Sequence, residues 1–235
     1  MFNDLFTRIT AGAILAGGLS LSTGAWAQSD EDGSGSALVE VTVTNVTRDQ
    51  QFTPILVASH EAGVRLFELG EPASPELQIV AEEGNVAPLT AALLALPSVL
   101  DVTNSGALLD PGASATITVR VRGTFNHISL AAMLIPTNDG FFALNGARMP
   151  AGRNQALVLT SVAYDAGSER NDELCASIPG PSFVECGGPG GGGQPAGGEE
   201  GYVHVHAGIH GIGDLDEAQR DWRNPVARIT LRRVQ

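Results

Sequence analysis

Three segments of this chain alternate between apolar and polar residues, and this period of two constrains the fold more than any other feature. The segments are LVEVTVTN (38–45), ATITVRVR (115–122) and ARITLR (227–232). Alternation puts every second side chain on the same face of an extended strand, so each segment predicts a strand with one buried side. Because such strands are typical of antiparallel sheets with one wet face, we expect an all-β domain.

Other segments are apolar on both faces. ISLAAMLI (128–135) and ALVLTSVA (156–163) are largely apolar, and FTPILVAS (52–59) is nearly so. We interpret them as central strands that are covered on both sides, as in a β-sandwich.

Two segments between these strands have helical spacing, namely 74–85 and 87–97. Ser74 is a typical N-cap, Pro75 suits the first helical position and Gly84 suits a helix end. These one or two short helices are expected to cap one end of the sandwich.

The N-terminus has the pattern of a signal peptide, which we place at residues 1–27. A short apolar run, 9–21, is followed by the small-x-small sequence Ala25-Trp26-Ala27. The run is shorter than a membrane span, so no transmembrane span is expected after cleavage. The alternative is a hydrophobic helix that is retained as an anchor.

The rest of the chain is expected to contain a flexible acidic leader (28–36) and one folded domain (37–235). A glycine-rich segment, 187–198, contains eight glycines and is followed by further periodic sequence, so it predicts a flexible insertion inside that domain. The net charge of −13 argues against a nucleic acid partner, because phosphate contacts need clustered basic residues.

Cys175 and Cys186 are the only cysteines of the chain. An even count in an exported protein favours a disulfide between them. Two free thiols, or a pair of zinc ligands, are the alternatives.

Carboxylates follow two of the apolar runs, in the stretches 133–146 and 162–172. Asp139, Asp165 and Glu169 could therefore converge on one calcium ion, which prefers oxygen ligands. The alternative is that Asp139 and Asp165 only shape turns through hydrogen bonds to the backbone.

Five segments in the same order resemble the spondin domain, the N-terminal domain of the secreted F-spondin and mindin proteins, which occurs also in bacterial exported proteins. The resemblance covers roughly residues 38–234. The segments are FTPILVASHEAGVRLFELGEPAS (52–74), VAEEGN (80–85), IPTNDGFFALNG (135–146), YDAGSE (164–169) and NPVARITLRR (224–233). The resemblance implies a C2-like antiparallel β-sandwich of about eight strands, with a calcium site at one edge.

The resemblance also implies which residues bind calcium. The acidic loop of the family maps to Asp139, its Tyr-Asp-Ala-Gly motif maps to Asp165, and the acid four residues later maps to Glu169. Two departures affect this assignment. Gly140 separates Asp139 from the aromatic pair, and Glu169 replaces the shorter Asp, so Asp172 is a substitute candidate for the third ligand.

A histidine cluster suggests a second metal site. His204, His206 and His210 lie within seven residues, and neutral imidazoles so placed suit zinc, copper or iron. The alternative is an ordinary strand and turn with exposed histidines.

We therefore expect an exported, calcium-binding, spondin-like adhesion or binding module, periplasmic or at the cell surface, with a protein or glycan partner. It is not expected to be an enzyme, because the sequence contains no nucleophile elbow, Walker loop or dinucleotide fingerprint. One alternative function is a metalloprotein or metalloenzyme that uses the histidine cluster. The other is a metal-free structural exported domain.

Overall fold

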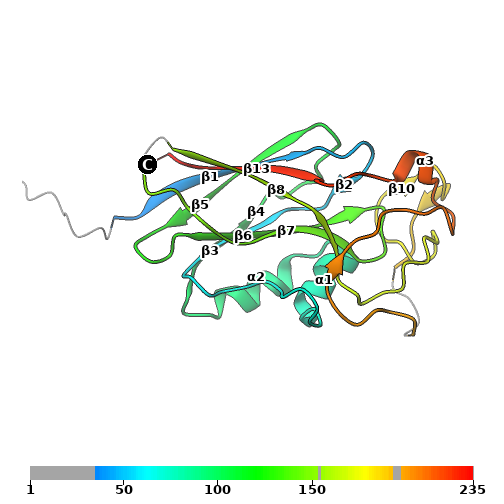
Figure 1. The fold of residues 1–235 in the computed structure, drawn as a ribbon, viewed down its shortest axis with the longest axis horizontal. Coiled ribbons are helices and arrows are strands. Elements are labelled where there is room, and N and C mark those ends of the chain that lie inside the picture. Colours follow the sequence, from blue (N-terminus) through cyan, green and yellow to red (C-terminus); the bar gives the residue numbers. More distant parts are fainter. Residues whose placement is uncertain (1–34, 153–154, 193–196, 235) are drawn as a thin grey trace, which may run out of the picture. The chain divides into compact units, whose positions relative to one another are not determined.

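The computed structural model of this protein describes residues 35–152, 155–192 and 197–234. The predicted signal peptide and all but the last two residues of the predicted leader lie outside the described residues, so neither prediction is tested. The described residues form two main antiparallel sheets that pack against each other (Figure 1).

The first sheet has four strands in the order β5-β1-β13-β8. Its strands are β1 (Ala37–Asn45), β5 (Ser114–Val121), β8 (Ala156–Ser161) and β13 (Ala227–Arg233). Val41 pairs with Ile117 on one side and Leu231 on the other, and all three are buried. The three alternating segments are thus adjacent strands, and their apolar faces form one continuous half of the core.

The second sheet runs β12-β9-β7-β6-β3-β4, and β2 also pairs with β6. Its strands are β2 (Gln51–Phe52), β3 (Leu56–His60), β4 (Val99–Asn104), β6 (His127–Ile135), β7 (Gly140–Arg148), β9 (Ala163–Asp165) and β12 (His204–Val205). Across the described residues, eight strands have five or more residues: β1, β3, β4, β5, β6, β7, β8 and β13. The predicted all-β sandwich is confirmed.

The central strands β3 and β6 of the second sheet are buried on both faces. Along β6, Leu130 and Ala132 face the first sheet, whereas Ala131 faces a second apolar cluster. That cluster is formed by α1 (Pro75–Glu83) and α2 (Ala87–Leu94), which lie over the outer face of the sheet (Figure 1). The helices therefore cover a face rather than an end of the sandwich, because the outer side chains of β6 are also apolar and need a partner.

The cap residues of α1 have the predicted roles. The hydroxyl of Ser74 accepts a hydrogen bond from the N–H of Leu77, and Pro75 occupies the first turn. Gly84 ends the helix in the left-handed conformation, with a φ of 66°, and a Cβ there would collide with Thr53.

The segment 156–163 is not a central strand, and that prediction is wrong. β8 is the edge of the first sheet, its side chains alternate between exposed and partly buried, and Val158 is 50% exposed. The chain then crosses to the second sheet, where Ala163 begins β9. The apolar run therefore covers two short strands in different sheets, which explains why it lacks one consistent period.

Cys175 and Cys186 form the predicted disulfide, with their Cα atoms 5.5 Å apart. The bond encloses β10 (Ser182–Phe183), which pairs with β11 (Gly188–Pro189). The N–H of Gly191 donates to the carbonyl of Cys175. The start of the glycine-rich segment is thus packed on the disulfide loop, whereas residues 193–196 lie outside the described part.

The short helix α3 (Glu217–Arg220) precedes β13. Among the described residues, no helix is long and apolar enough to cross a membrane.

Candidate functional site

Asp139 and Asp165 are brought together by the β7–β9 ladder. Gly140, the first residue of β7, is paired with Asp165, and the N–H of Ala166 donates to the carbonyl of Asp139. Both aspartates are completely buried. A Cβ at position 140 would lie 2.7 Å from the hydroxyl oxygen of Thr137, which explains the glycine after Asp139.

The two carboxylate oxygens of Asp139 have different environments. Oδ2 accepts hydrogen bonds from the N–H groups of Ser168 at 2.7 Å and Glu169 at 2.9 Å, and from the hydroxyl of Ser168 at 3.2 Å. Oδ1 is buried and has no hydrogen-bond partner within the described structure. Burial, followed by the negative charge of Asp165, raises the pKa of Asp139 to about 8. The folded chain thus buries one carboxylate oxygen, Asp139 Oδ1, to which no described group donates a hydrogen bond.

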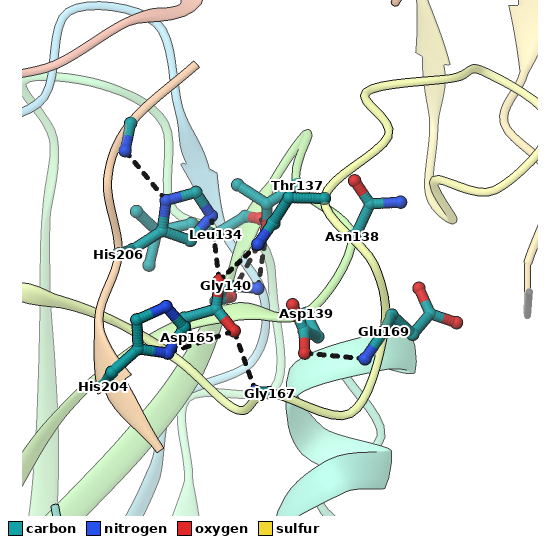
Figure 2. A network of polar contacts seen from close by, with 12 residues as sticks. Leu134, Thr137, Asn138, Asp139, Gly140, Asp165, Gly167, Glu169, His204 and His206 are labelled. Atoms are coloured by element: carbon teal, nitrogen blue, oxygen red, sulfur yellow. Dashed lines mark hydrogen bonds and ion pairs between the residues drawn. The ribbon is translucent and has the colours of Figure 1, made fainter. Parts of the chain in front are cut away.

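Asp165 is fixed by two hydrogen bonds. Its Oδ1 accepts from the N–H of Gly167 at 2.8 Å, and its Oδ2 accepts from the side-chain amide of Asn171 at 2.6 Å. The imidazoles of His204 and His206 are turned toward this carboxylate, at 3.7 Å from Oδ1 and 4.0 Å from Oδ2 (Figure 2). Asp165 is therefore the junction between the acidic loops and the histidines.

Glu169 reaches the site through its main chain. Its N–H donates to Asp139, whereas its carboxylate points away from Asp165 (Figure 2). The structure thus brings Asp139 and Asp165 together as expected, and it gives Glu169 a part in holding Asp139.

Asp172, the substitute candidate, belongs to a different local network. Its carboxylate accepts from the side chains of Asn138 and Ser177 and from the N–H of Leu174. Burial alone would raise the pKa of Asp172, but these hydrogen bonds outweigh burial and lower it. The carboxylate is fully engaged in shaping its own loop.

His206 is buried in a state that does not suit a metal ligand. The N–H of Gly208 donates to its Nδ1 at 3.0 Å, so in the neutral ring the hydrogen is on Nε2, which faces Asp165. Burial lowers the pKa of His206, and this effect outweighs the negative charge of Asp165, which acts in the opposite direction. The lowered pKa favours the neutral ring. A histidine that binds a metal through one ring nitrogen normally donates a hydrogen bond from the other. In His206, Nδ1 instead accepts a hydrogen bond.

The third histidine of the cluster, His210, is more exposed than the other two. His204 and His206 both lie beside the Asp165 carboxylate, but His210 is exposed and its main-chain N–H donates to Glu173. In the described ranges, no group of three or more His, Cys, Asp or Glu side chains is arranged to hold a metal ion.

Sequence reasoning did not identify two of the residues that hold the aspartates. Ser168 supplies two donors to Asp139, and Asn171 supplies one to Asp165. The Asp-x-Gly pattern at 165–167 is the signal for the turn that Asp165 makes with Gly167. The contacts of Ser168 have no sequence signal, because they join segments about thirty residues apart.

The donor chemistry of the Asp139–Asp165 pair fits calcium in part. Two buried carboxylates supply oxygen ligands, and the oxygen without a donor would gain most from a cation. The remaining ligands would have to be main-chain carbonyls and water, because Glu169 points elsewhere.

Comparison with known proteins identifies the family. The family model described as Spondin_N matches residues 44–171, which is more than half of the chain and includes Asp139, Asp165 and Glu169. No curated protein matches the sequence. Spondin domains are extracellular, non-enzymatic binding and adhesion modules. With this match over most of the sandwich, the chain belongs to the spondin N-terminal domain family.

Proposed function

We propose that this chain is an exported spondin-like binding module that holds a calcium ion at Asp139 and Asp165. The observation that carries the proposal is the buried pair of carboxylates in which Asp139 Oδ1 has no donor among the described residues. Ionising a buried carboxylate without a partner is costly, which is why the pKa of Asp139 is raised, and a bound divalent cation would offset that cost.

Calcium would stabilise the edge of the sandwich where these carboxylates lie. Asp139 precedes β7, and Asp165 ends β9 before a long irregular segment. An ion bound by both would link the β6–β7 loop to the segment after β9 and would offset the repulsion between the two charges. Extracellular modules of this kind bind calcium at roughly 0.1 to 1 mM.

The position of these loops at the ends of strands supports a role in partner binding. Loops on a rigid sandwich commonly carry binding residues, and calcium would fix their geometry. We propose a protein or glycan partner at the cell surface or in the periplasm. The disulfide between Cys175 and Cys186 supports export, because such bonds persist in oxidising compartments.

Calorimetric titration of the purified protein with calcium tests the proposal. We expect one site in the wild type, and at least tenfold weaker binding, equivalent to about 1.4 kcal/mol, in Asp139→Asn and Asp165→Asn. Asp110→Asn is the matched control, because Asp110 is exposed and carries the same charge change. Absence of binding, or equal affinity in all four proteins, would contradict the site.

The two alternatives are separated by metal analysis of the same protein. A transition metal at His204, His206 and His210 would appear as stoichiometric zinc, copper or iron that is lost in His204→Ala. A metal-free structural domain would contain no transition metal, and its titration with calcium would give no heat of binding. The hydrogen bond that His206 Nδ1 accepts from the N–H of Gly208 argues against the transition-metal site.

A further inference from the structure

A polar cavity lies at the end of the sandwich opposite to the carboxylates. Four strand ends meet there: β1 begins at Ala37, β5 ends at Val121, β7 ends at Arg148 and β13 ends at Arg233. All four of these residues line one cavity of about 240 Å³. The cavity is therefore built by the ends of both sheets.

Three arginines line this cavity: Arg122, Arg148 and Arg233. Among the residues that the structure describes, no aspartate or glutamate is in its lining. None of the three guanidinium groups forms an ion pair with a described carboxylate. In a chain with a net charge of −13 and only 13 basic residues, this concentration of positive charge without ion pairs in the described part of the chain needs an explanation.

Arg233 gives an independent indication of a ligand. Its Nε is buried and has no hydrogen-bond partner in the described structure. A buried donor without an acceptor costs free energy, and the cost is larger for a charged group. Arg233 also lines the cavity, so an anion bound there is an acceptor toward which its guanidinium group could turn.

We propose that the cavity binds a tetrahedral oxyanion, either free phosphate or sulfate or the same group as a monoester on a sugar. Guanidinium groups form paired hydrogen bonds with such oxyanions, and three of them around one cavity match several oxygens. The volume is below the roughly 300 to 1,000 Å³ of pockets that enclose a larger ligand. The anionic group alone would enter, and any sugar would remain outside.

This arginine cavity is distinct from the Asp139–Asp165 site. Arg148 ends β7, whereas Asp139 precedes its start, and a nine-residue strand spans roughly 30 Å. Glu61 lines a neighbouring cavity that shares Arg148, and its carboxylate accepts a hydrogen bond from Thr124. The anion site therefore does not depend on whether calcium binds.

Titration calorimetry on the full-length protein tests this site with three probes: inorganic phosphate, inorganic sulfate and glucose 6-phosphate, at constant ionic strength set with sodium chloride. We expect saturable binding of at least one probe, and at least tenfold weaker binding in Arg148→Gln and Arg233→Gln. The matched control is Arg228→Gln, because Arg228 is an exposed residue of the same strand as Arg233 and does not line the cavity.

The outcomes distinguish a free oxyanion from a sugar-linked one, and they show whether binding takes place in the cavity. Similar affinities for free phosphate and glucose 6-phosphate would support recognition of the oxyanion itself, and binding of the ester alone would support a sugar-linked group. Thermal unfolding of each variant checks that it is folded. No saturable binding of any probe, or equal weakening by Arg228→Gln, would overturn the proposal.

Discussion

The main-chain carbonyl of Asp139 accepts a hydrogen bond from Ala166, the residue after Asp165, and the two aspartates are completely buried together. The consequence is electrostatic. Burial and the charge of Asp165 raise the pKa of Asp139 to about 8, far above its ordinary value of 3.8. The free energy of unfolding must therefore depend on pH and on any cation that binds there.

In the presence of a chelator, we expect the contribution of Asp139 to stability to fall as pH rises from about 4 to 8. Over this range the unfolded chain has released the proton of Asp139 and the folded chain retains it, so the unfolded state binds fewer protons and raising pH favours unfolding. Denaturant unfolding of wild type and Asp139→Asn, compared at each pH, measures this contribution.

The comparison with Asp139→Asn is needed because buried histidines act in the opposite direction. Burial lowers the pKa of His60 and His206, so their contribution to stability rises with pH up to about the ordinary value of 6.5. That part is common to both proteins and cancels in the difference. A difference that does not change between pH 5 and pH 9 would contradict the raised pKa of Asp139.

Calcium binding should release a proton. At pH 7 the raised pKa leaves Asp139 mostly protonated, and a metal ligand must be deprotonated, so we expect close to one proton released per calcium. Near pH 9 the number should approach zero. Calorimetry in two buffers of different ionisation enthalpy counts these protons, and a release that is the same at both pH values would argue against Asp139 as a ligand.

Gly167→Ala should disrupt the carboxylate site. Gly167 has a φ of 65°, and a Cβ there would collide with the main chain of Tyr202. We expect a loss of at least about 3 kcal/mol in unfolding free energy and weaker calcium binding, because the neighbouring Ser168 N–H holds Asp139.

The matched control for this change is Gly106→Ala. Gly106 has a similar φ of 71° but open space at the Cβ position, so only backbone strain of about 1 kcal/mol applies. Equal losses of stability in the two variants would show that the contact with Tyr202 does not matter.

Removing the disulfide should destabilise the domain modestly. The bond joins residues 11 positions apart, and closing a loop of this size contributes about 2 to 3 kcal/mol. We expect this loss in the double variant Cys175→Ala and Cys186→Ala, measured by denaturant unfolding. Reductant should bring the wild type to a similar midpoint, and a midpoint that is insensitive to reductant would indicate that the bond is absent in solution.

The sequence predicted the sandwich because its signals are local. Alternation in 38–45, 115–122 and 227–232 depends only on which face of a strand is buried, and the three segments are neighbours in one sheet. The segment 156–163 was misassigned because it joins two short strands in different sheets, and continuous apolarity does not reveal where a chain crosses between sheets.

The candidate site was predictable only in part. Asp139 and Asp165 follow strand-like runs, and a resemblance to the family selected them. The role of Glu169 could not be predicted, because it depends on a main-chain N–H that donates across to Asp139. The state of His206 likewise depends on the backbone of Gly208, which no residue pattern specifies.

The most direct measurement of the central claim is a crystal structure of the protein grown with calcium. We predict one ion that contacts Asp139 Oδ1 and the Asp165 carboxylate, with oxygen–ion distances of about 2.3 to 2.6 Å. A structure in saturating calcium with no ion between Asp139 and Asp165, or with the ion bound only elsewhere, would contradict the claim.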